Sequence, residues 1–444
     1  MTDDLKAAAC AAVDRRRDEL AAFAQAVAER PELGFFETET ARRFSRALAD
    51  LGLPHESGLA LTGVKAVLAG GAPGPTVAVL GELDALPVRG HPLADPITGA
   101  AHACGHHAQL AMVLGVARGL LDSGALSHLA GRVALMAVPA EEYVELERRL
   151  ALRAEGRIEF LGGKAELLRL GAFDDVDLAM MVHTSSEPDY RSFAVGGSNN
   201  GVAAKMVRFV GRAAHAGSAP HQGINALNAA HVALAAMHAQ RETYRDQDHV
   251  RVHPIITQGG DVVNAVPADV RLEMFVRGAS LEAIADASAK VDRALRAGAL
   301  ALGARVEVTT LPGYLPMRHD PALGALFRAN AERLVGADEV VDAGHRGGST
   351  DMGDLSHVLP AVHPYATGAQ GHGHGADYLI VDAGRAIANP AKAMAMTVID
   401  LLADDAAGAR RVLAAARPPM TRATYLAFMR ELLGTWDYAE ADGA

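Results

Sequence analysis

The stretch T76-V-A-V-L80-G-E-L-D84 decides the fold of this chain. Its first five residues are apolar or β-branched, and a short run of this kind predicts a buried strand. Two later runs repeat the arrangement, since V133-A-L-M-A-V138 leads into P-A-E-E and L178-A-M-M-V182 leads into His183. Acidic or imidazole side chains therefore follow three predicted buried strands.

A helix is predicted between the first two of these strands. From about Gly105 to Leu121, apolar residues recur at helical spacing. Strands that alternate with helices indicate an α/β layer fold with a central mixed, largely parallel sheet. In such sheets ligands bind beyond the carboxyl ends of the strands. Four polar side chains are therefore expected to meet at one edge: Asp84, Glu141, Glu142 and His183.

The segment A101-H-A-C-G-H-H107 adds a thiol and imidazoles at the start of the same helix. Only one glycine separates Cys104 from His106, so both side chains can turn towards one centre. A helix N-terminus and a nearby cation favour the thiolate of Cys104. Thiolate, imidazole and carboxylate together suit zinc, and also manganese or cobalt. Taken singly, these residues read as a small buried thiol, a structural histidine and a solvated acidic pair, but together they predict a metal site.

Composition limits the class of protein. The chain has 444 residues, half of them apolar, which is enough for two or three domains. Its formal net charge of −11 and the lack of a basic run argue against nucleic-acid binding. The two cysteines, Cys10 and Cys104, form no disulfide framework. An acidic N-terminus and no apolar run of about 20 residues predict a cytoplasmic protein without a membrane span.

Residues 5–53 read as two helices separated by Pro31 and Gly34, and the pattern changes after about Tyr190. The later order is β-α-β-β-α-β, which is typical of a ferredoxin-like α+β domain. Its predicted strands are 202–210, 250–258, 268–277 and 304–311, and its predicted helices are 223–241 and 280–299. Strand 268–277 alternates apolar and polar residues and is expected to be covered on one face. The predicted domains are 1–194 and 312–444, the second ending in helices, with 195–311 inserted between them.

Seven motifs in this order resemble the aminoacylase/carboxypeptidase amidohydrolases, co-catalytic metallopeptidases of family 20, subfamily D. The motifs are G-E-L-D-A-L-P, H-A-C-G-H, P-A-E-E, V-H-T, A-A-H-A-G-S-A-P, N-A-V-P and H-G-A-D-Y. Auxin-conjugate hydrolases, bacterial aminoacylases and aminobenzoyl-glutamate hydrolase belong to this family. The resemblance covers roughly residues 10 to 400.

The resemblance implies two divalent ions per subunit, zinc or manganese first and cobalt or nickel as further choices. Cys104 would bridge the ions, and the other ligands would be His106, Glu142, His183 and His374. His374 is preferred to His372 because of its spacing to Tyr378. Glu141 would be the general base, and Asp84 would orient a ligand.

The inserted domain would be a lid that also forms a homodimer. It would supply His215 and Asn264 to the scissile carbonyl, with His215 reaching the other protomer, and Arg277 would bind a substrate carboxylate. The implied reaction is hydrolysis of N-acyl amino acids or small peptides, as in aminoacylases, carboxypeptidases and dipeptidases.

Three positions depart from the family pattern. His107 stands where most members have Asp, Gln109 replaces a histidine, and G-E-L-D replaces a pattern with two aspartates. These departures favour the aminobenzoyl-glutamate or dipeptidase-like branch. Two other readings stay open at this point: an amidase with Cys104 as nucleophile and His106 as base, and a non-catalytic binding relative.

Overall fold

In the computed structural model, which describes residues 1–439, the run 76–80 lies within β3 (Ala72–Glu82), an inner strand of a six-stranded sheet. The strand order is β1-β2-β6-β3-β7-β17. β3 pairs in parallel with β6 and β7, and β7 with β17, whereas β1, β2 and β6 pair antiparallel. The predicted central mixed, largely parallel sheet is thereby confirmed. The other strands are β1 (His55–Leu59), β2 (Gly63–Ala69), β6 (Ala130–Val138), β7 (Leu178–Met180) and β17 (Ala361–Val362).

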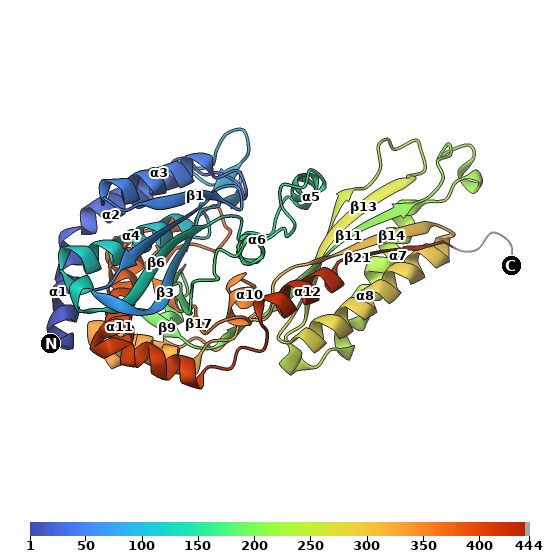
Figure 1. The fold of residues 1–444 in the computed structure, drawn as a ribbon. Coiled ribbons are helices and arrows are strands. Elements are labelled where there is room, and N and C mark those ends of the chain that lie inside the picture. Colours follow the sequence, from blue (N-terminus) through green and yellow to red (C-terminus); the bar gives the residue numbers. More distant parts are fainter. Residues whose placement is uncertain (440–444) are drawn as a thin grey trace. The chain divides into compact units, whose positions relative to one another are not determined.

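Helices α4 (His106–Asp122) and α11 (Asn389–Ala415) pack on β3 and on each other, and α1 covers both (Figure 1). Alanine and glycine on these helices let their backbones approach closely, which compensates for the scarcity of aromatic residues. The helical segment Gly384–Ala415 is long and apolar enough to cross a membrane, but 89% of its most apolar window is buried. Such burial is usual for a core helix of a soluble protein.

The N-terminal segment differs from its prediction. It forms three helices, α1 (Thr2–Arg15), α2 (Arg17–Ala28) and α3 (Thr38–Asp50), where the apolar spacing predicts two. The extra break lies at Arg16, whose backbone is not helical (φ −105°, ψ 5°). Apolar periodicity continues across this turn, so the pattern carries no sign of the break.

The chain divides into two units. Unit 1 comprises Met1–Ser198, Arg318–Gly344 and Asp354–Arg422, and unit 2 comprises Asn199–Met317, His345–Gly353 and the chain from Ala423 onward. A second sheet in unit 1 has the order β15-β9-β18-β8 and carries His183 on its edge strand. The strand predicted over 178–182 thus ends at Met180, and the chain then enters another sheet. These strands are β8 (His183–Ser185), β9 (Phe193–Val195), β15 (Val340–Asp342) and β18 (Tyr365–Thr367).

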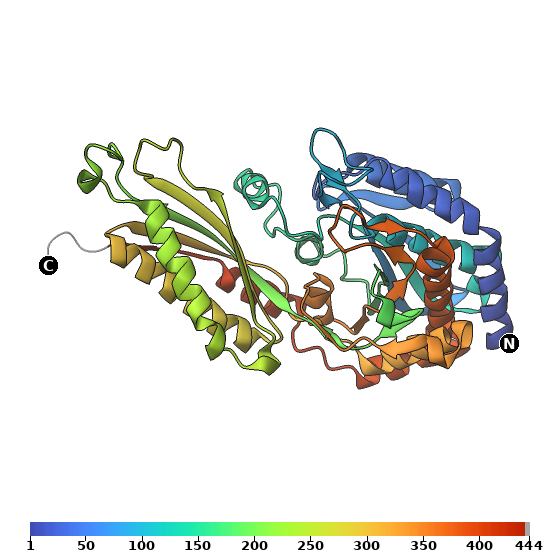
Figure 2. The same ribbon diagram turned by 180° about the vertical axis from the view of Figure 1, so that it is seen from behind.

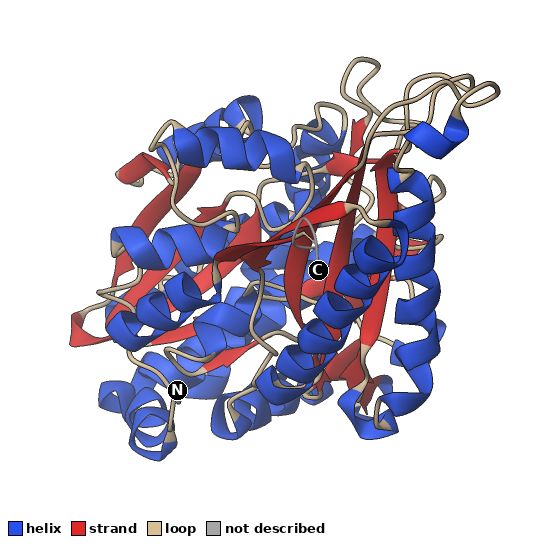
Figure 3. Ribbon diagram, turned by 90° about the vertical axis from the view of Figure 1, so that its right-hand side faces the viewer, coloured by secondary structure: helices blue, strands red, loops and turns tan. Residues whose placement is uncertain are grey.

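Unit 2 contains the predicted β-α-β-β-α-β order with strand order β12-β13-β11-β14, which is ferredoxin-like. Helices α7 and α8 lie side by side on one face of this sheet (Figures 2 and 3). Along β13, buried residues alternate with half-buried ones, as expected for a strand covered on one face. The elements are β11 (Gly201–Val210), α7 (Ala226–Ala239), β12 (Arg251–Gln258), β13 (Asp269–Gly278), α8 (Leu281–Leu302) and β14 (Arg305–Pro312).

The end of the chain also differs from its prediction. Helix α12 (Arg422–Leu432) is followed by β21 (Gly434–Tyr438), which pairs antiparallel with β14 as a fifth strand. The predicted helical ending within the first domain is therefore wrong, because this strand adds to the sheet of unit 2. The remaining elements are β4 (Leu86–Pro87), β5 (Ala100–Ala101), α5 (Leu146–Ala154), α6 (Gly163–Leu170), β10 (Ser198–Asn199), α9 (Pro321–Val335), β16 (His345–Arg346), α10 (Met352–Ser356), β19 (Ala369–Gln370) and β20 (Leu379–Ile380).

Candidate metal centre

Five segments of unit 1 bring polar side chains together near the carboxyl end of β3. They are the end of β3, the turn after β6, the start of β8, the start of α4 and the loop after β19. Parallel strands end at the same edge of a sheet, so residues far apart in sequence meet there. The residues brought together are Asp84, Cys104, His106, Glu141, Glu142, His183 and His374.

Two groups of candidate ligand atoms share the sulfur of Cys104. One group contains Cys104, His106 and His183, and the other contains Cys104, Glu142 and His374. Within each group the ligand atoms lie within 4.8 Å of one another. Sγ of Cys104 lies 3.4 Å from Nε2 of His183, and Nε2 of His374 lies 3.2 Å from Oε1 of Glu142. The sulfur of Cys104 is therefore common to both groups of candidate ligand atoms.

His372, the alternative to His374, lies outside this centre. Its Nδ1 is 2.9 Å from Oδ2 of Asp377, and its side chain is 90% exposed.

Backbone carbonyls orient two of the imidazoles. Nδ1 of His106 donates to the carbonyl oxygen of Asp84 at 2.8 Å, and Nδ1 of His183 donates to that of Thr184 at 2.7 Å. A carbonyl oxygen only accepts, so each Nδ1 carries the proton and each Nε2 is left with its lone pair in the neutral ring. Both rings thus present a metal-binding nitrogen to the centre.

The donor set fits divalent metal ions. Nε2 of His106 and Oε1 of Glu142 are buried, and neither makes a hydrogen bond of acceptable geometry within residues 1–439. Buried polar atoms of this kind need a partner such as an ion. Burial and Glu142 raise the pKa of the Cys104 thiol, but His183 and His106 outweigh them and lower the pKa to about 5. A thiolate, imidazoles and a carboxylate are the ligands that zinc and related ions prefer.

Asp84 links two parts of the centre. Its Oδ2 accepts a hydrogen bond from the backbone N–H of Glu142 at 2.9 Å, and its Oδ1 lies 3.2 Å from Nδ1 of His106. Beside it, Glu37 is fully buried and accepts hydrogen bonds from Thr62 and Ala140. Burial first, and then the charge of Asp84, raise the pKa of Glu37 to about 7.

Unusual backbone conformations position several of these side chains. Ala140, directly before Glu141, has φ 53°, and His374 has φ 63°. Residues other than glycine rarely adopt this region, and such strain concentrates at functional sites. Gly105 has φ 93° between Cys104 and His106, and a Cβ there would lie 1.9 Å from Oγ1 of Thr184.

One buried cluster at this centre is not evident from the sequence. Glu82, Lys164 and Gln109 are fully buried, and Nζ of Lys164 donates to Oε1 of Glu82 at 2.6 Å. Glu82, His106 and Glu141 form a third group of candidate ligand atoms. The sequence does indicate a role for Glu82, because this residue follows an apolar run and a buried carboxylate needs a partner. No pattern in the sequence points to Lys164.

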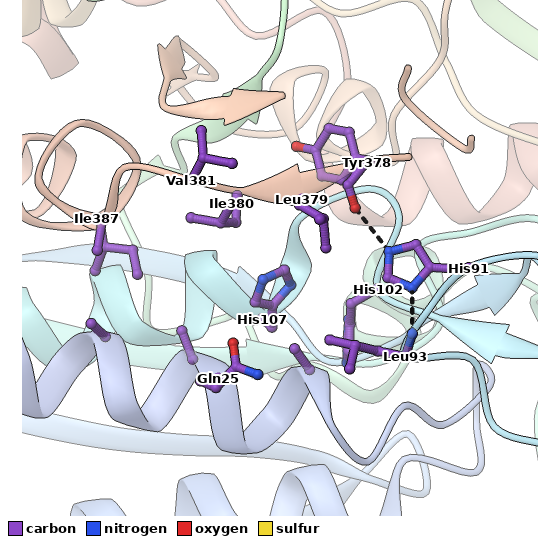
Figure 4. A pocket seen from close by; sticks show the side chains of 14 residues that line it. Gln25, His91, Leu93, His102, His107, Tyr378, Leu379, Ile380, Val381 and Ile387 are labelled. Carbon is purple, nitrogen blue, oxygen red and sulfur yellow. Dashed lines mark hydrogen bonds between the residues drawn. The ribbon is translucent and has the colours of Figure 1, made fainter. Parts of the chain in front are cut away.

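His107 and Gln109, which both differ from the family pattern, lie in different surroundings. Gln109 contacts Glu82, whereas His107 lines a pocket of about 190 Å³ together with His91 and His102 (Figure 4). The rings of His102 and His107 are 5.2 Å apart, and burial lowers the pKa of both imidazoles. Both rings are therefore neutral at pH 7.

The remaining sequence-derived residues belong to unit 2. Nδ1 of His215 accepts backbone N–H groups from Gly217 and Ser218, each at 3.1 Å, so the neutral ring carries its proton on Nε2. His215 forms an antiparallel bridge with Ala265, the residue after Asn264. Arg277 lies on the face of β13 that α7 and α8 leave uncovered, with its guanidinium 5.1 Å from the ring of Phe275.

Residues 198–301 match the model of the peptidase dimerisation domain of the M20 family. The chain is 30% identical over 434 residues to the Xaa-Arg dipeptidase of Mus musculus, covering 90% of this chain and 89% of that protein. It is also 30% identical over 319 residues to one of the subunits of p-aminobenzoyl-glutamate hydrolase from Escherichia coli, covering 69% of this chain and 67% of that protein.

A similar solved structure is that of the Bacillus subtilis YXEP protein, described as a dinuclear metal binding peptidase of the M20 family. The TM-score is 0.65 at 21% identity, and the match covers 87% of this chain and 98% of that chain. This likeness shows a shared fold, and the sequence relatives are amide-hydrolysing enzymes. The chain therefore belongs to the M20 family, and it is a metal-dependent hydrolase of amide bonds.

Proposed function

We propose that this enzyme binds two divalent ions in unit 1 and hydrolyses N-acyl amino acids or small peptides. Cys104 would bridge the ions, with His106 and His183 as ligands of one and Glu142 and His374 as ligands of the other. The observation that carries this proposal is the membership of Cys104 in both three-residue groups. Zinc and manganese suit this donor set best, with cobalt and nickel as further choices.

In this proposal Glu141 is the general base. Two divalent ions supply Lewis acidity, which activates water and polarises a carbonyl group. Glu141 is nearly buried, and its Oε2 lies 4.0 Å from Nε2 of His106, beside the ligand atoms rather than among the two groups that share Cys104. It would accept the proton of the attacking water and deliver it to the leaving nitrogen. Asp84 would hold His106 and the backbone of Glu142 in place.

Residues of unit 2 would bind the substrate. Because Nδ1 of His215 is occupied by two backbone donors, its Nε2–H is available to a carbonyl oxygen that gains negative charge. Asn264 would donate to the same oxygen. Arg277 would bind a free carboxylate, for which a planar guanidinium is suited.

A dipeptide or acyl amino acid with a free carboxylate is the proposed substrate. The relatives that support this class are Xaa-Arg dipeptidase, p-aminobenzoyl-glutamate hydrolase and the N-acetyl-L-cysteine deacetylase of Bacillus subtilis. All three names describe an amino acid joined to another group through an amide bond. A cytoplasmic location accords with such small substrates.

We also propose a homodimer formed through unit 2. Strand β21 covers the β14 edge of the sheet, whereas β12 has a strand neighbour on one side only within residues 1–439. Ile255 and Ile256 on β12 are 52% and 44% exposed. An edge strand with exposed apolar side chains is a site for pairing with another chain, and a twofold axis would join two β12 strands antiparallel.

Metal analysis combined with a substrate library tests this function. Protein purified without chelator should contain two divalent ions per protomer and hydrolyse members of a mixed set of dipeptides, acyl amino acids and p-aminobenzoyl-glutamate. Removal of the ions should abolish hydrolysis, and zinc or manganese should restore it. Full activity of the metal-free protein would overturn the proposal and favour Cys104 as a nucleophile, a reading that the family relationship does not support.

A further inference from the structure

The buried cluster of Glu82, Lys164 and Gln109 has no role in the function proposed so far. Oε1 of Glu82 accepts from Nζ of Lys164 at 2.6 Å, and its Oε2 accepts from Nε2 of Gln109 at 2.9 Å. The backbone N–H of Glu82 donates in turn to Oε1 of Gln109 at 3.0 Å. The amide of Gln109 therefore forms hydrogen bonds with both the backbone and the side chain of Glu82, and these bonds fix the direction of the carboxylate.

Stability alone does not explain this cluster. Removing a lysine and a glutamate from water costs about as much free energy as their attraction returns, so a buried pair is weak evidence for stabilisation. Glu82 is thus a fully buried carboxylate whose two oxygens are held in place by Lys164 and Gln109.

The second oxygen of this carboxylate faces a metal-binding nitrogen. Oε2 of Glu82 lies 3.1 Å from Nε2 of His106. Since Nδ1 of His106 donates its proton to the carbonyl of Asp84, Nε2 of the neutral ring has only a lone pair. Two acceptor atoms at this distance repel each other unless a proton or a metal ion lies between them, and Nε2 of His106 makes no hydrogen bond of acceptable geometry within residues 1–439.

The distance matches that of two ligands of one ion. Donor atoms bound at about 2.1 Å, with angles between octahedral and tetrahedral, lie roughly 3.0–3.4 Å apart. The other neighbouring ligand atoms of the centre have the same spacing, 3.2 Å for Glu142 and His374 and 3.4 Å for Cys104 and His183. The distance between Oε2 of Glu82 and Nε2 of His106 is therefore similar to the distances between these other ligand atoms.

We propose that Glu82 is a direct ligand of the ion that His106 binds, and that Lys164 and Gln109 hold its carboxylate in position. This inference rests on the two-metal centre proposed above. Glu82 and His106 belong, with Glu141, to one group of candidate ligand atoms that lie within 4.8 Å of one another. Glu82 would add an anionic ligand beside His106, and Lys164 would offset part of its negative charge.

Three variants separate a ligand from a partner of Lys164. Glu82→Asp keeps the charge opposite Lys164 but withdraws the oxygen by one methylene. Glu82→Gln removes the charge that faces Lys164. The double variant Glu82→Gln with Lys164→Met removes both charges and preserves the volume, and its unfolding midpoint in chelator is measured beside that of the natural protein. Ion content is measured by elemental analysis, and affinity by competition with a chromogenic chelator.

If Glu82 is a ligand, Glu82→Asp and the double variant keep one ion, and their affinity for the other falls about 10- to 100-fold or more. Wild-type ion content and affinity in both variants would overturn the inference and leave Glu82 as a structural partner of Lys164. Diffraction from zinc-loaded crystals of the natural protein, measured at the zinc edge, gives a direct check. An ion bound to His106 but not to Oε2 of Glu82 would overturn the inference alone, whereas crystals with no ion at Cys104 would overturn the two-metal function as well.

Discussion

Glu141 and Glu142 are adjacent in the chain but belong to different groups of candidate ligand atoms. Glu142 lies in a group with Cys104 and His374, whereas Glu141 lies in the group with Glu82 and His106. The backbone N–H of Glu142 is tied to Asp84, which orients this residue towards the sulfur. The left-handed conformation of Ala140 sets the direction of the chain directly before both residues.

We predict that Glu141→Gln retains both ions and lowers kcat about 100-fold or more, because the amide cannot accept the water's proton. Glu142→Gln should lose one ion, since an amide is a poor ligand for zinc. Elemental analysis and steady-state kinetics of the two variants measure these effects. Loss of metal from Glu141→Gln together with full retention in Glu142→Gln would mean that the two roles are reversed.

The buried carboxyl of Glu37 predicts a dependence of stability on pH. Burial and Asp84 raise its pKa from the ordinary value of 4.5 to about 7 in the folded protein. The stability that this group contributes is therefore fully present below about pH 4.5 and is lost as pH rises through about 7.

Glu37→Gln cannot ionise and can keep the hydrogen bonds to Thr62 and Ala140. Its free energy of unfolding, relative to that of the natural protein, should accordingly increase between pH 4.5 and pH 8. Denaturant unfolding of both proteins in chelator, at several pH values, measures this difference. A difference that stays constant with pH would contradict the assignment.

At the scale of elements, the turn into α4 shapes the centre. Gly105 is the N-cap of the helix with φ 93°, and the ligand atoms of its neighbours Cys104 and His106 lie within 4.8 Å of each other. Its missing side chain makes room for Thr184, whose hydroxyl also contacts that of Tyr378 at 2.7 Å.

Gly105→Ala should therefore lower stability and weaken metal binding. A positive φ alone costs an alanine about 1–3 kcal/mol, and the contact with Thr184 adds to that cost. Gly124→Ala is a matched control, because Gly124 has φ 71° but no atom within 4 Å of its Cβ position. Equal losses of stability and metal affinity in both variants would show that the contact with Thr184 has no effect.

Strand β21 gives a second prediction at this scale. It pairs with β14 from Val306–Tyr438 to Thr310–Gly434, and the ring of Trp436 lies 4.6 Å from the guanidinium of Arg296. A chain that ends at Leu432 should expose the edge of β14, unfold at a lower temperature and associate more readily. A chain that ends at Tyr438 keeps β21 and serves as control. Identical melting and association of the two chains would show that β21 contributes nothing.

At the scale of the whole molecule, the residues of the proposed mechanism belong to two units. The metal centre lies in unit 1, whereas His215, Asn264 and Arg277 lie in unit 2. Residues 198–301 match a peptidase dimerisation domain, so the proposed action of His215 in a partner's site can be tested with mixed dimers.

We predict that Glu141→Ala and His215→Ala complement each other if His215 acts in the partner's site. Each variant alone should be nearly inactive. In a mixed dimer one site carries both lesions and the other carries neither, and random mixing makes about half of the dimers mixed, so about a quarter of wild-type activity should return. Mixtures within one variant are the control. If protomers exchange without recovery of activity, His215 does not act in trans.

The α/β class, the ferredoxin-like insertion and the meeting of Asp84, Glu141, Glu142 and His183 at one edge follow from local pattern alone. Buried parallel strands have to be apolar, and polar residues directly after them have to lie at the carboxyl edge. Cys104 and His106 could be added because one glycine separates them at a helix start. These features depend on residues close together in sequence.

Other features were decided by tertiary structure. The break at Arg16 and the pairing of β21 with β14 cannot be recognised from the spacing of apolar residues. Each depends on the parts of the folded chain that pack beside it. The same holds for Lys164 and Gln109, which reach Glu82 from positions 82 and 27 residues away in the chain. A buried charge needs a partner, but its sequence does not say which distant residue provides it, since only the folded chain brings the two side chains together.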